Sequence, residues 1–476
     1  MAVVIPCKNE EDNLRLLLPQ LKRVLGSLES PVSLHVVDGQ STDRTREVAR
    51  AHGVEVLIQR GSGYGGAIRT ALESLTTEWV VTLDADCSHP PATLKSLMAA
   101  LEQAEIVIAS RYVAHGYARM PAGRKLLSVL LNRTFRWALS IPVRDLSSGY
   151  RAYNRKAIVA IPLEHDTFAF LPEVVLKAFA RGYRVLELPF HYRPRAEGAS
   201  HARIVAFGIQ YTRLLFSFWK FRNSVKCADY DSRAFSSRIP VQRWWQRRRY
   251  DIISDMVGNS LAVLDVGCGS TEILNGLPQV VGMDPQMNKL RYMRAPGRLL
   301  LRGSAYEIPF ASGSFETVVC SQVIEHLPKD DVIIDELVRC LAPGGILILG
   351  TVDYGRWQWP LIERIYAFVK PGGYADEHIT HYTHDSLIQE LTRRQLEVLE
   401  VRYIAKAEIV IRARKPGATG RVMPMLTQAS FDRALACPRD HAALEYDKDA
   451  YRCTQCDRQY PVIDSIPDFT TSPGTE

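Results

Sequence analysis

The chain reads Val80-Val81-Thr82-Leu83-Asp84-Ala85-Asp86-Cys87-Ser88-His89-Pro90-Pro91 at the point that decides its fold. The apolar, β-branched beginning predicts a buried strand that ends at two carboxylates. Because side chains alternate along an extended chain, we expect Asp84 and Asp86 to point the same way. Ligands of α/β sheets lie beyond the carboxyl ends of parallel strands. The stretch therefore predicts a Mg²⁺ or Mn²⁺ site completed by substrate phosphates, or else a solvated pair that caps the next helix.

Strands and helices alternate around this stretch. Strands are expected at residues 3–5 and 32–37, the second of them ending at Asp38, and apolar residues at helical spacing follow the first: Leu14, Leu17, Leu18 and Leu21. This order implies a parallel sheet with helices on both faces. A glycine-rich turn at Gly61, Gly63, Gly65 and Gly66 either brings backbone N–H groups close to a ligand or only shapes a loop.

Composition limits the remaining possibilities. A chain of 476 residues needs two to four domains. The net charge of +7 suits anionic ligands or an anionic membrane surface, and the basic residues form no long stripe typical of nucleic-acid binding. Nine scattered cysteines fit a reducing cytoplasm better than a secreted disulfide framework.

Membrane insertion is not expected from the sequence. Met1 leads almost directly into a strand, so we expect no signal peptide. The best candidate for a spanning helix, residues 204–221, contains Gln210, Arg213 and Lys220. A membrane role would therefore be peripheral, on the cytoplasmic face.

Ordered motifs cover the N-terminal region. They are Val4-Ile5-Pro6-x-x-Asn9-Glu10, Asp38-Gly39-x-Ser41-Thr42-Asp43, Asp84-Ala85-Asp86-x-Ser88-His89-Pro90-Pro91, Ser110-Arg111-Tyr112, Arg124-x-x-x-Ser128-x-x-x-Asn132, Asp145-x-x-Ser148-Gly149-Tyr150-Arg151, Glu187-x-Pro189 and Arg195-x-x-Gly198-x-Ser200. With these motifs the region resembles inverting family 2 glycosyltransferases of the GT-A fold, above all the dolichyl- or polyprenyl-phosphate sugar synthases.

The resemblance implies a role for individual residues. A nucleotide sugar, GDP- or UDP-linked, would be held by Pro6, Lys8, Glu10, Asp38, Ala85, Asp86 and His201. The metal ligands would be Asp84, Asp86 and Ser88, and the phosphates of donor and acceptor would face Arg111, Arg124 and Arg195. His201 stands where the family usually has lysine, so a fixed cation becomes one that titrates near neutrality and clamps phosphate less at higher pH.

The acceptor decides whether a base is needed. A polyprenyl phosphate is already an anion, whereas a sugar hydroxyl needs a carboxylate base, for which Asp145 and Glu173 are the candidates. A lipid acceptor also predicts apolar helices near the site, and residues 126–139 and 204–221 fit. Such helices either lie in a membrane interface or pack against the rest of the protein.

A second enzyme domain follows a basic, aromatic segment. Residues 243–249, Arg-Trp-Trp-Gln-Arg-Arg-Arg, either touch lipid head groups or begin the next domain with buried tryptophans. The motifs that come next are Val263-Leu264-Asp265-Val266-Gly267-Cys268-Gly269-Ser270, Val280-Val281-Gly282-Met283-Asp284, Ile308-Pro309-Phe310, Ser314-Phe315-Glu316-x-Val318, Val323-Ile324-Glu325-His326 and Leu341-x-Pro343-Gly344-Gly345. They resemble class I S-adenosylmethionine-dependent methyltransferases of the ubiquinone-biosynthesis type.

This second resemblance implies a cofactor site. S-adenosylmethionine would contact Asp265, Gly267, Gly269, Asp284, Ser304 and Ala305. Thr271 replaces a glycine of the family's loop and Ser304 an acidic residue, so a non-catalytic domain is the alternative. The candidates for a base or a substrate contact are His326, His378 and His381.

The C-terminal tail carries cysteines at metal-like spacing. Cys437-Pro438-Arg439-Asp440 and Cys453-Thr454-Gln455-Cys456 resemble the two knuckles of small zinc-ribbon proteins that partner methyltransferases. Asp440 stands where the fourth cysteine belongs, with His441 beside it. Three cysteines completed by Asp or His suit Zn²⁺, and a ribbon that has lost its metal is the alternative.

The sequence thus predicts an α/β, bifunctional enzyme. We expect a GT-A glycosyltransferase at residues 1–205, a helix and linker at 206–240, a Rossmann-like methyltransferase at 241–415, a linker at 416–430 and a zinc-ribbon-like module at 431–476. The first domain would transfer a mannose- or glucose-like sugar to polyprenyl phosphate, and the second would methylate in the same pathway. The alternative is a transferase that extends a saccharide chain, with a binding scaffold as its C-terminal half.

Overall fold

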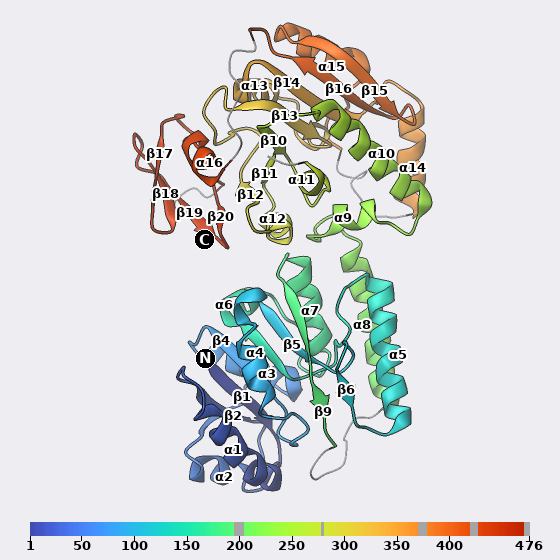
Figure 1. Ribbon diagram of the computed structural model, residues 1–476. Coiled ribbons are helices and arrows are strands. Elements are labelled where there is room, and N and C mark those ends of the chain that lie inside the picture. Colours follow the sequence, from blue (N-terminus) through green and yellow to red (C-terminus); the bar gives the residue numbers. More distant parts are fainter. Residues whose placement is uncertain (195–203, 278–279, 370–377, 419–426, 471–476) are drawn as a thin grey trace. The chain divides into compact units, whose positions relative to one another are not determined.

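Two seven-stranded sheets organise the chain, one in each of two units, Met1–Arg222 and Asn223–Glu476 (Figure 1). The computed structural model describes residues 1–194, 204–277, 280–369, 378–418 and 427–470. The side chains of Arg124 and of residues 204–210 and 365–369 lie outside this description.

The N-terminal unit alternates strands and helices, as predicted. Its elements are β1 (Ala2–Cys7), α1 (Glu11–Leu25), β2 (Ser33–Asp38), α2 (Thr45–Ala51), β3 (Glu55–Ile58), α3 (Gly63–Ser74), β4 (Trp79–Thr82), α4 (Thr93–Met98), β5 (Ile106–Ser110), β6 (Tyr117–Ala118), α5 (Ala122–Leu139), β7 (Arg151–Asn154), α6 (Arg155–Val159), α7 (Phe170–Ala180), β8 (Val185–Pro189), β9 (His191–Tyr192) and α8 (Ile204–Arg222). The strand order is β3-β2-β1-β4-β7-β5-β8.

Helices cover both faces of this sheet. Successive residues of β1 pack on opposite sides: Val3 and Ile5 join the core under α1, α2 and α4, while Ala2 and Val4 join the core under α3, α6 and α7. The leucines predicted at helical spacing in α1 are fully buried. One expectation is corrected, because β7 runs antiparallel to both β4 and β5 and the sheet is mixed.

The strand that carries the acidic pair is shorter than predicted. β4 ends at Thr82, and residues 85–87 form a turn in which Cys87 has a φ of 59°. The alternation argument therefore does not apply to Asp84 and Asp86, because neither lies in an extended strand. They still lie just beyond the carboxyl end of a strand, where the sheet was expected to place its ligand.

The two amphipathic helices pack along the flank of the N-terminal unit (Figure 1). Phe135 of α5 meets Tyr211 of α8 edge to face at 5.7 Å, and Nε of Arg222 donates to the carbonyl of Leu139. α8 thus belongs to this unit, and the predicted boundary at residue 205 falls at its start. None of the described helices is both long and apolar enough to span a membrane.

The C-terminal unit contains the second large sheet, in the order β12-β11-β10-β13-β14-β16-β15. Its elements before the tail are α9 (Tyr230–Phe235), α10 (Pro240–Val257), β10 (Val263–Val266), α11 (Ile273–Gly276), β11 (Val280–Asp284), α12 (Met287–Met293), β12 (Leu299–Arg302), β13 (Phe315–Ser321), η2 (Ile324–His326), α13 (Asp331–Cys340), β14 (Leu341–Val352), α14 (Gln358–Val369), α15 (His384–Arg393), β15 (Glu397–Ile404) and β16 (Glu408–Arg414). Strands β10 to β14 run parallel to one another. β16 runs antiparallel to β14, and β15 runs antiparallel to β16.

The basic, aromatic segment forms α10, the first long helix of this unit. Trp245 is half-buried and donates from Nε1 to Glu408 at 2.7 Å, whereas Trp244 is 52% exposed. Arg249 pairs with the same carboxylate, its Nε 2.5 Å from Oε1 of Glu408. The segment thus belongs to the next domain, as one of the two interpretations had it, with one of its two tryptophans packed. This unit starts earlier, at Asn223.

The tail folds onto the edge of the second large sheet. It consists of α16 (Gln428–Ala434), β17 (Leu444–Asp447), β18 (Ala450–Cys453), β19 (Gln459–Ile463) and β20 (Ile466–Pro467). The backbone N–H of Phe469 donates to the carbonyl of Arg302 in the edge strand β12. Phe431 packs edge to face on Phe310 at 5.9 Å, so the tail and the sheet share one hydrophobic core.

Candidate active sites

The first two loops of the N-terminal unit are tied together by the residues of their motifs. Asn9, at a φ of 58°, donates its N–H to Oγ of Ser41 at 2.9 Å, and its side-chain oxygen accepts the N–H of Thr42 at 2.8 Å. Glu10 donates its N–H to Oγ1 of Thr45. Both loops lie at the carboxyl ends of paired strands, so these bonds fix the shape of one wall of the expected nucleotide site.

The residues expected to hold the nucleoside follow the same two strands. Pro6 is half-buried in β1, Lys8 is exposed, and Glu10 accepts a hydrogen bond from Asn13 at 2.6 Å. Asp38 is fully buried and accepts the N–H of Ser41 at 3.2 Å. The structure thus brings Pro6, Lys8, Glu10 and Asp38 to neighbouring strand ends.

Asp84 and Asp86 differ in their surroundings. Asp86 is buried, and its Oδ1 accepts the hydroxyl of Ser88 at 2.5 Å, which orients the carboxylate. The Asp84 side chain is 32% exposed, and its Oδ1 lies so close to Gly149 that a Cβ there would approach it to 3.0 Å. Ser88 therefore contacts the expected metal ligand Asp86 directly.

His89 holds the first of these carboxylates. Its Nδ1 accepts the backbone N–H of Asp84 at 2.9 Å, so the ring proton is on Nε2, which lies 3.7 Å from Oδ2 of Asp84. Burial lowers the pKa of His89 despite the carboxylates of Asp84 and Asp86. A neutral histidine stacked on Tyr150 at 5.0 Å therefore positions the acidic pair.

The glycine-rich turn packs against the protein itself. The N–H of Gly65 donates to the carbonyl of Asp166 at 2.7 Å, and a Cβ on Gly65 would approach the carbonyl oxygen of His165 to 2.5 Å. Gly63 has a φ of 67° and would meet the Asp166 carbonyl oxygen at 2.6 Å. Of the two interpretations of this turn, the structure favours the one in which glycine only shapes a loop.

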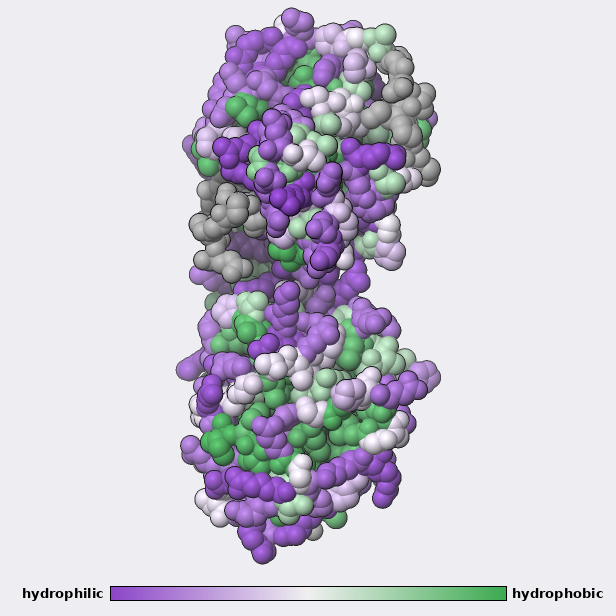
Figure 2. Space-filling model, turned by 90° about the vertical axis from the view of Figure 1, so that its left-hand side faces the viewer, coloured by the Kyte–Doolittle hydropathy of each residue, from purple (hydrophilic) through white to green (hydrophobic). Residues whose placement is uncertain are grey.

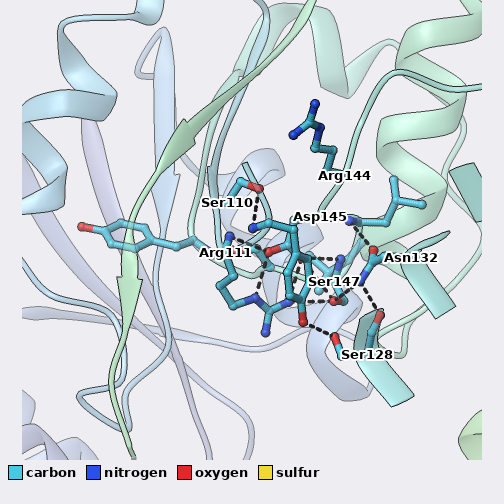
Figure 3. Close-up of polar contacts among 12 residues, drawn as sticks. Ser110, Arg111, Ser128, Asn132, Arg144, Asp145 and Ser147 are labelled. Atoms are coloured by element: carbon cyan, nitrogen blue, oxygen red, sulfur yellow. Dashed lines mark hydrogen bonds and ion pairs between the residues drawn. The ribbon is translucent and has the colours of Figure 1, made fainter. Parts of the chain in front are cut away.

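Arg111 is the centre of a buried polar cluster (Figure 3). Its Nε and Nη2 donate to the two oxygens of Asp145 at 2.8 and 2.7 Å, and Nη2 also donates to Oγ of Ser147. Asn132 of α5 donates to the same Oγ and accepts the N–H of Leu146. The Nη1 group of Arg111 has no hydrogen-bond partner among the described residues, so it remains as a donor for a ligand.

Electrostatics keep this pair ionised. Although burial disfavours the charged forms, the Asp145 carboxylate raises the pKa of Arg111, and Arg111 lowers the pKa of Asp145 below its usual range. The backbone N–H of Asp145 in turn donates to Glu187 at 2.8 Å. Asp145 thus holds Arg111 in place, and a carboxylate so engaged is a poor proton acceptor.

Glu173, the other candidate base, is engaged as well. It is fully buried in α7, where it accepts the N–H groups of Glu164 and His165 and pairs with Nζ of Lys177 at 2.7 Å. Burial raises the pKa of Glu173, but Lys177 and the two N–H groups outweigh it and lower the pKa. Neither candidate base fits the role that a hydroxyl acceptor requires.

Some predicted site residues lie beyond what can be described. Arg195 and His201 lie outside the described residues, and so does the side chain of Arg124. Ala85 is buried between the two aspartates of the acidic pair.

Apolar side chains are exposed along α5. Leu126 is 69% exposed and Trp137 66%, and Leu127, Val129 and Leu130 are exposed as well, while Arg133 and Arg136 add positive charge on the same helix. Figure 2 looks at the side of this unit that lies away from α5 and α8 in Figure 1, and hydrophobic residues gather there too.

In the C-terminal unit, the expected cofactor residues gather at one edge of the sheet. Gly267 and Gly269 follow β10, and Asp284 ends β11. Ser304 and Ala305 follow β12, and these three strands are neighbours in the sheet. Oδ2 of Asp284 accepts the N–H of Gly269 at 2.8 Å and thereby joins two of these strand ends.

The glycines of this loop are required by the protein's own side chains. A Cβ on Gly267, at a φ of 72°, would overlap Val323, and a Cβ on Gly269 would approach Oδ2 of Asp231 to 2.7 Å. This carboxylate of α9 accepts Nζ of Lys289 at 3.1 Å and the N–H of Ser270 at 3.1 Å. Sequence analysis missed Asp231 and Lys289, because no motif connects α9 with a loop so far along the chain.

Asp265 gives the C-terminal unit a pH dependence. Burial, together with the Asp284 carboxylate, raises the pKa of Asp265 to about 7. An aspartate in an unfolded chain titrates near ~3.9, so the folded protein binds this proton more tightly. The stability gained is complete below the unfolded pKa and is lost as the pH rises through the folded value.

We therefore expect the urea midpoint of the full chain to fall between about pH 5 and about pH 7.5, and Asp265→Asn to flatten this dependence. The asparagine cannot ionise, so the variant is expected to gain relative to the parent at the higher pH. Exposed Asp251 provides the matched control, since Asp251→Asn should leave the slope unchanged. Parallel slopes for Asp265→Asn and the parent chain would rule out this origin of the dependence.

The three candidate histidines lie near the ends of the next two strands. His326 belongs to η2, which follows β13, and its ring centroid is 4.8 Å from that of His378. His381 stacks on Tyr354, just beyond β14, at 4.0 Å. The structure thus brings all three together on the edge of the sheet that carries the glycine loop.

The tail gathers its predicted metal ligands. Ligand atoms of Cys437, Asp440, Cys453 and Cys456 all lie within 4.8 Å of one another, and the cluster contains Asp440 rather than His441. Sγ of Cys437 is 3.7 Å from Sγ of Cys456, close to the ~3.8 Å that tetrahedral Zn–S bonds of ~2.3 Å require. The N–H groups of Gln455 and Cys456 point at Sγ of Cys453, an arrangement that stabilises a thiolate. The donor set fits Zn²⁺.

Comparisons with known proteins agree with the division of the chain into an N-terminal and a C-terminal unit. Residues 2–161 match Glycosyl transferase family 2, and residues 264–349 match a methyltransferase domain family. An uncharacterized glycosyltransferase of Mycobacterium tuberculosis is 30% identical over 200 residues, which are 42% of this chain and 88% of that protein. Polyprenol monophosphomannose synthase of Mycolicibacterium smegmatis is 30% identical over 218 residues, 42% of this chain and 79% of its own.

Among solved structures, glucosyl-3-phosphoglycerate synthase of M. tuberculosis, in complex with Mn²⁺, UDP and phosphoglyceric acid, matches 46% of this chain and 78% of its own, with 22% identity and a TM-score of 0.39. The extent and identity of the sequence matches define the N-terminal unit as a glycosyltransferase. The chain belongs to glycosyl transferase family 2, and a methyltransferase domain follows in the same chain.

Proposed function

We propose that the N-terminal unit transfers a sugar from a nucleotide diphosphate sugar to a polyprenyl phosphate. The observation that carries this proposal is the fixed geometry at the strand ends, where an acidic pair oriented by Ser88 and His89 accompanies the buried Arg111. The polyprenol-phosphate relative supports the class of acceptor.

The state of the two candidate bases favours the lipid phosphate over a sugar hydroxyl. Asp145 is bound to Arg111 and Glu173 to Lys177, so neither is available to remove a proton. A phosphate acceptor arrives ionised and needs no base. Extension of a saccharide chain, the alternative, would need a base to remove the proton of the acceptor hydroxyl.

Each side chain then has a defined task. Asp84 and Asp86 hold Mg²⁺ or Mn²⁺, which when bound stabilises the negative charge of the departing diphosphate. Arg111, fixed by two bonds to Asp145, offers Nη1 to the same phosphates without having to reorganise. Pro6, Lys8, Glu10 and Asp38 line the nucleoside end, with Ala85 between the metal ligands, and Arg124, Arg195 and His201 are assigned to the phosphates on the motif alone.

The direct test is radiolabelled sugar transfer from GDP- and UDP-sugars to a short polyprenyl phosphate. We expect metal-dependent label in the lipid phase, released by mild acid because the product is a sugar phosphodiester. Acid-stable label in a saccharide, with none in the lipid, would select the alternative acceptor.

The C-terminal unit is proposed to bind S-adenosylmethionine at Asp265, Gly267, Gly269, Asp284, Ser304 and Ala305 and to methylate a product of the same pathway. Isothermal titration with S-adenosylmethionine separates this from a binding scaffold, for which no heat is expected. The tail is proposed to hold Zn²⁺ at Cys437, Asp440, Cys453 and Cys456 and to stabilise the sheet on which it packs.

The exposed face of α5 is proposed to lie on a cytoplasmic membrane surface beside the lipid acceptor. Its leucines and Trp137, with Arg133 and Arg136 alongside, have the mixed apolar and basic character of an interfacial helix. We propose the domain limits expected from the sequence, with α8 assigned to the glycosyltransferase unit.

A further inference from the structure

A second group of potential metal ligands lies in the C-terminal unit, away from the tail. Ligand atoms of Glu325, His326 and His378 lie within 4.8 Å of one another. Two segments far apart in sequence meet there: the N–H groups of Ile379 and Thr380 donate to the carbonyl of Glu325 at 2.8 and 3.0 Å. The cluster is thus held by backbone bonds and does not depend on surface side chains.

Glu325 lacks the partners that a buried carboxylate needs. The residue is fully buried, and neither carboxylate oxygen has a hydrogen-bond partner among the described residues. The guanidinium of Arg249 is taken by Glu408, at 2.5 and 2.7 Å. Since an ionised carboxylate is costly to bury without a partner, a cation bound at this position would remove the penalty.

His378 is oriented as a metal-binding histidine is. Its Nδ1 lies 2.9 Å from the hydroxyl of Tyr354 and 3.3 Å from Oε1 of Glu363, and the same hydroxyl donates to Glu363 at 2.7 Å. Such outer partners fix the tautomer and leave Nε2 as the nitrogen that coordinates. A histidine buried only for packing needs no carboxylate behind it.

We propose that Glu325, His326 and His378 bind one divalent transition-metal ion in the C-terminal unit. One carboxylate and two imidazoles suit Zn²⁺, Mn²⁺, Fe²⁺ or Co²⁺, and three protein ligands leave coordination positions open. The ligands lie beyond the end of β13, next to the β10 strand that carries the glycine loop. If the unit methylates as proposed above, the open positions take oxygen atoms of the methyl acceptor, such as neighbouring sugar hydroxyls. This part of the inference rests on the proposed function.

Cobalt separates this site from the tail by its absorption. The full chain carrying Asp86→Asn, which weakens the glycosyltransferase site, is freed of metal and titrated with Co²⁺ alone. Cobalt in the tail absorbs in the near ultraviolet through its thiolates, whereas cobalt bound by Glu and His shows only weak visible bands. We expect two ions per chain, with both kinds of absorption.

Variants then assign the second ion. In the Asp86→Asn background, His378→Ala and Glu325→Gln should abolish binding of the cobalt ion that shows no thiolate absorption, and the tail signal should stay unchanged. Tyr354→Phe should weaken the binding of that same ion about 10- to 100-fold. The matched control is His384→Ala, a nearby histidine that pairs with exposed Asp385. A single bound ion, or equal binding by all variants, would overturn the proposal. No methyl donor is present, so the outcome does not depend on methyl transfer.

Melting of the metal-free chain gives a readout that a purely structural role would not share. Glu325→Gln removes a buried carboxyl group that lacks hydrogen-bond partners, so its metal-free form should melt at the same temperature as the parent or higher, and it should lose the upward shift that Co²⁺ gives the parent. A lower melting temperature of the metal-free variant would mean that the carboxylate has a structural partner, and the proposal would fail.

Discussion

Asp86→Asn is expected to lower sugar transfer by about 10³-fold or more, because it removes one of the two charges that we propose to hold the metal on the diphosphate. The substitution preserves the volume of the side chain and its acceptor oxygen for Ser88, so the turn after β4 keeps its shape. Initial rates at saturating nucleotide sugar and Mn²⁺ measure the effect.

The control for this variant is Asp12→Asn. Asp12 is an exposed carboxylate in the first turn of α1, so its loss changes net charge equally without touching the strand ends. We expect the control to transfer sugar at the parental rate. If Asp86→Asn retained more than about a tenth of that rate, the acidic pair would not be the metal site of the reaction.

Asp145→Ala is expected to destabilise the protein by about 3–5 kcal/mol, the usual effect of leaving a buried charge without its partner. Arg111 is only 10% exposed and loses two side-chain bonds and one backbone bond in this variant. Urea unfolding of the full chain measures the loss. A change below about 1 kcal/mol would show that water or another group neutralises Arg111.

The double replacement Arg111→Met with Asp145→Leu separates stability from function. Removing both charges leaves no buried charge unpaired, so most of the lost stability should return. Sugar transfer should not return, because the Nη1 donor is gone. Recovery of transfer in the double variant would mean that Arg111 has a structural role alone.

Much of the N-terminal fold could be predicted because its signals are local. The buried leucines of α1 and the apolar strands before Asp38 and Asp84 depend only on periodicity. The reversal of β7 could not be predicted, because the direction of a strand is set by how the chain returns to the sheet. The extent of β4 was overestimated, since a Leu-Asp-Ala-Asp run reads equally well as a strand end or a turn.

Sequence motifs indicated which residues gather at the first site. The contacts in the structure lead to a different interpretation of two features. Asp145 was considered as a base, but its carboxylate is committed to Arg111, a pairing across 34 positions that spacing does not reveal. Gly63 and Gly65 belong to a turn that could have bound a ligand or only shaped a loop, and both pack against the loop at Asp166. In both cases the missing information was the packing partner.

The C-terminal unit shows the same limit more strongly. The glycine loop and Asp284 were predicted together, because strand and turn signals place them in neighbouring segments. Asp231 comes from a short helix that precedes the domain's first strand. Glu325 stands out only because its buried carboxylate oxygens lack a hydrogen-bond partner among the described residues. Such features follow from burial, which a single sequence does not specify.

The docking of the tail onto β12 has a consequence for how the protein behaves at low abundance. Phe431, Asp468 and Phe469 contact Phe310 and Arg302 from within the same polypeptide. A tethered segment meets its surface at an effective concentration on the order of millimolar, whatever the number of molecules in the cell. Dilution therefore cannot strip the module from the sheet, and one gene product supplies both parts in equal amounts.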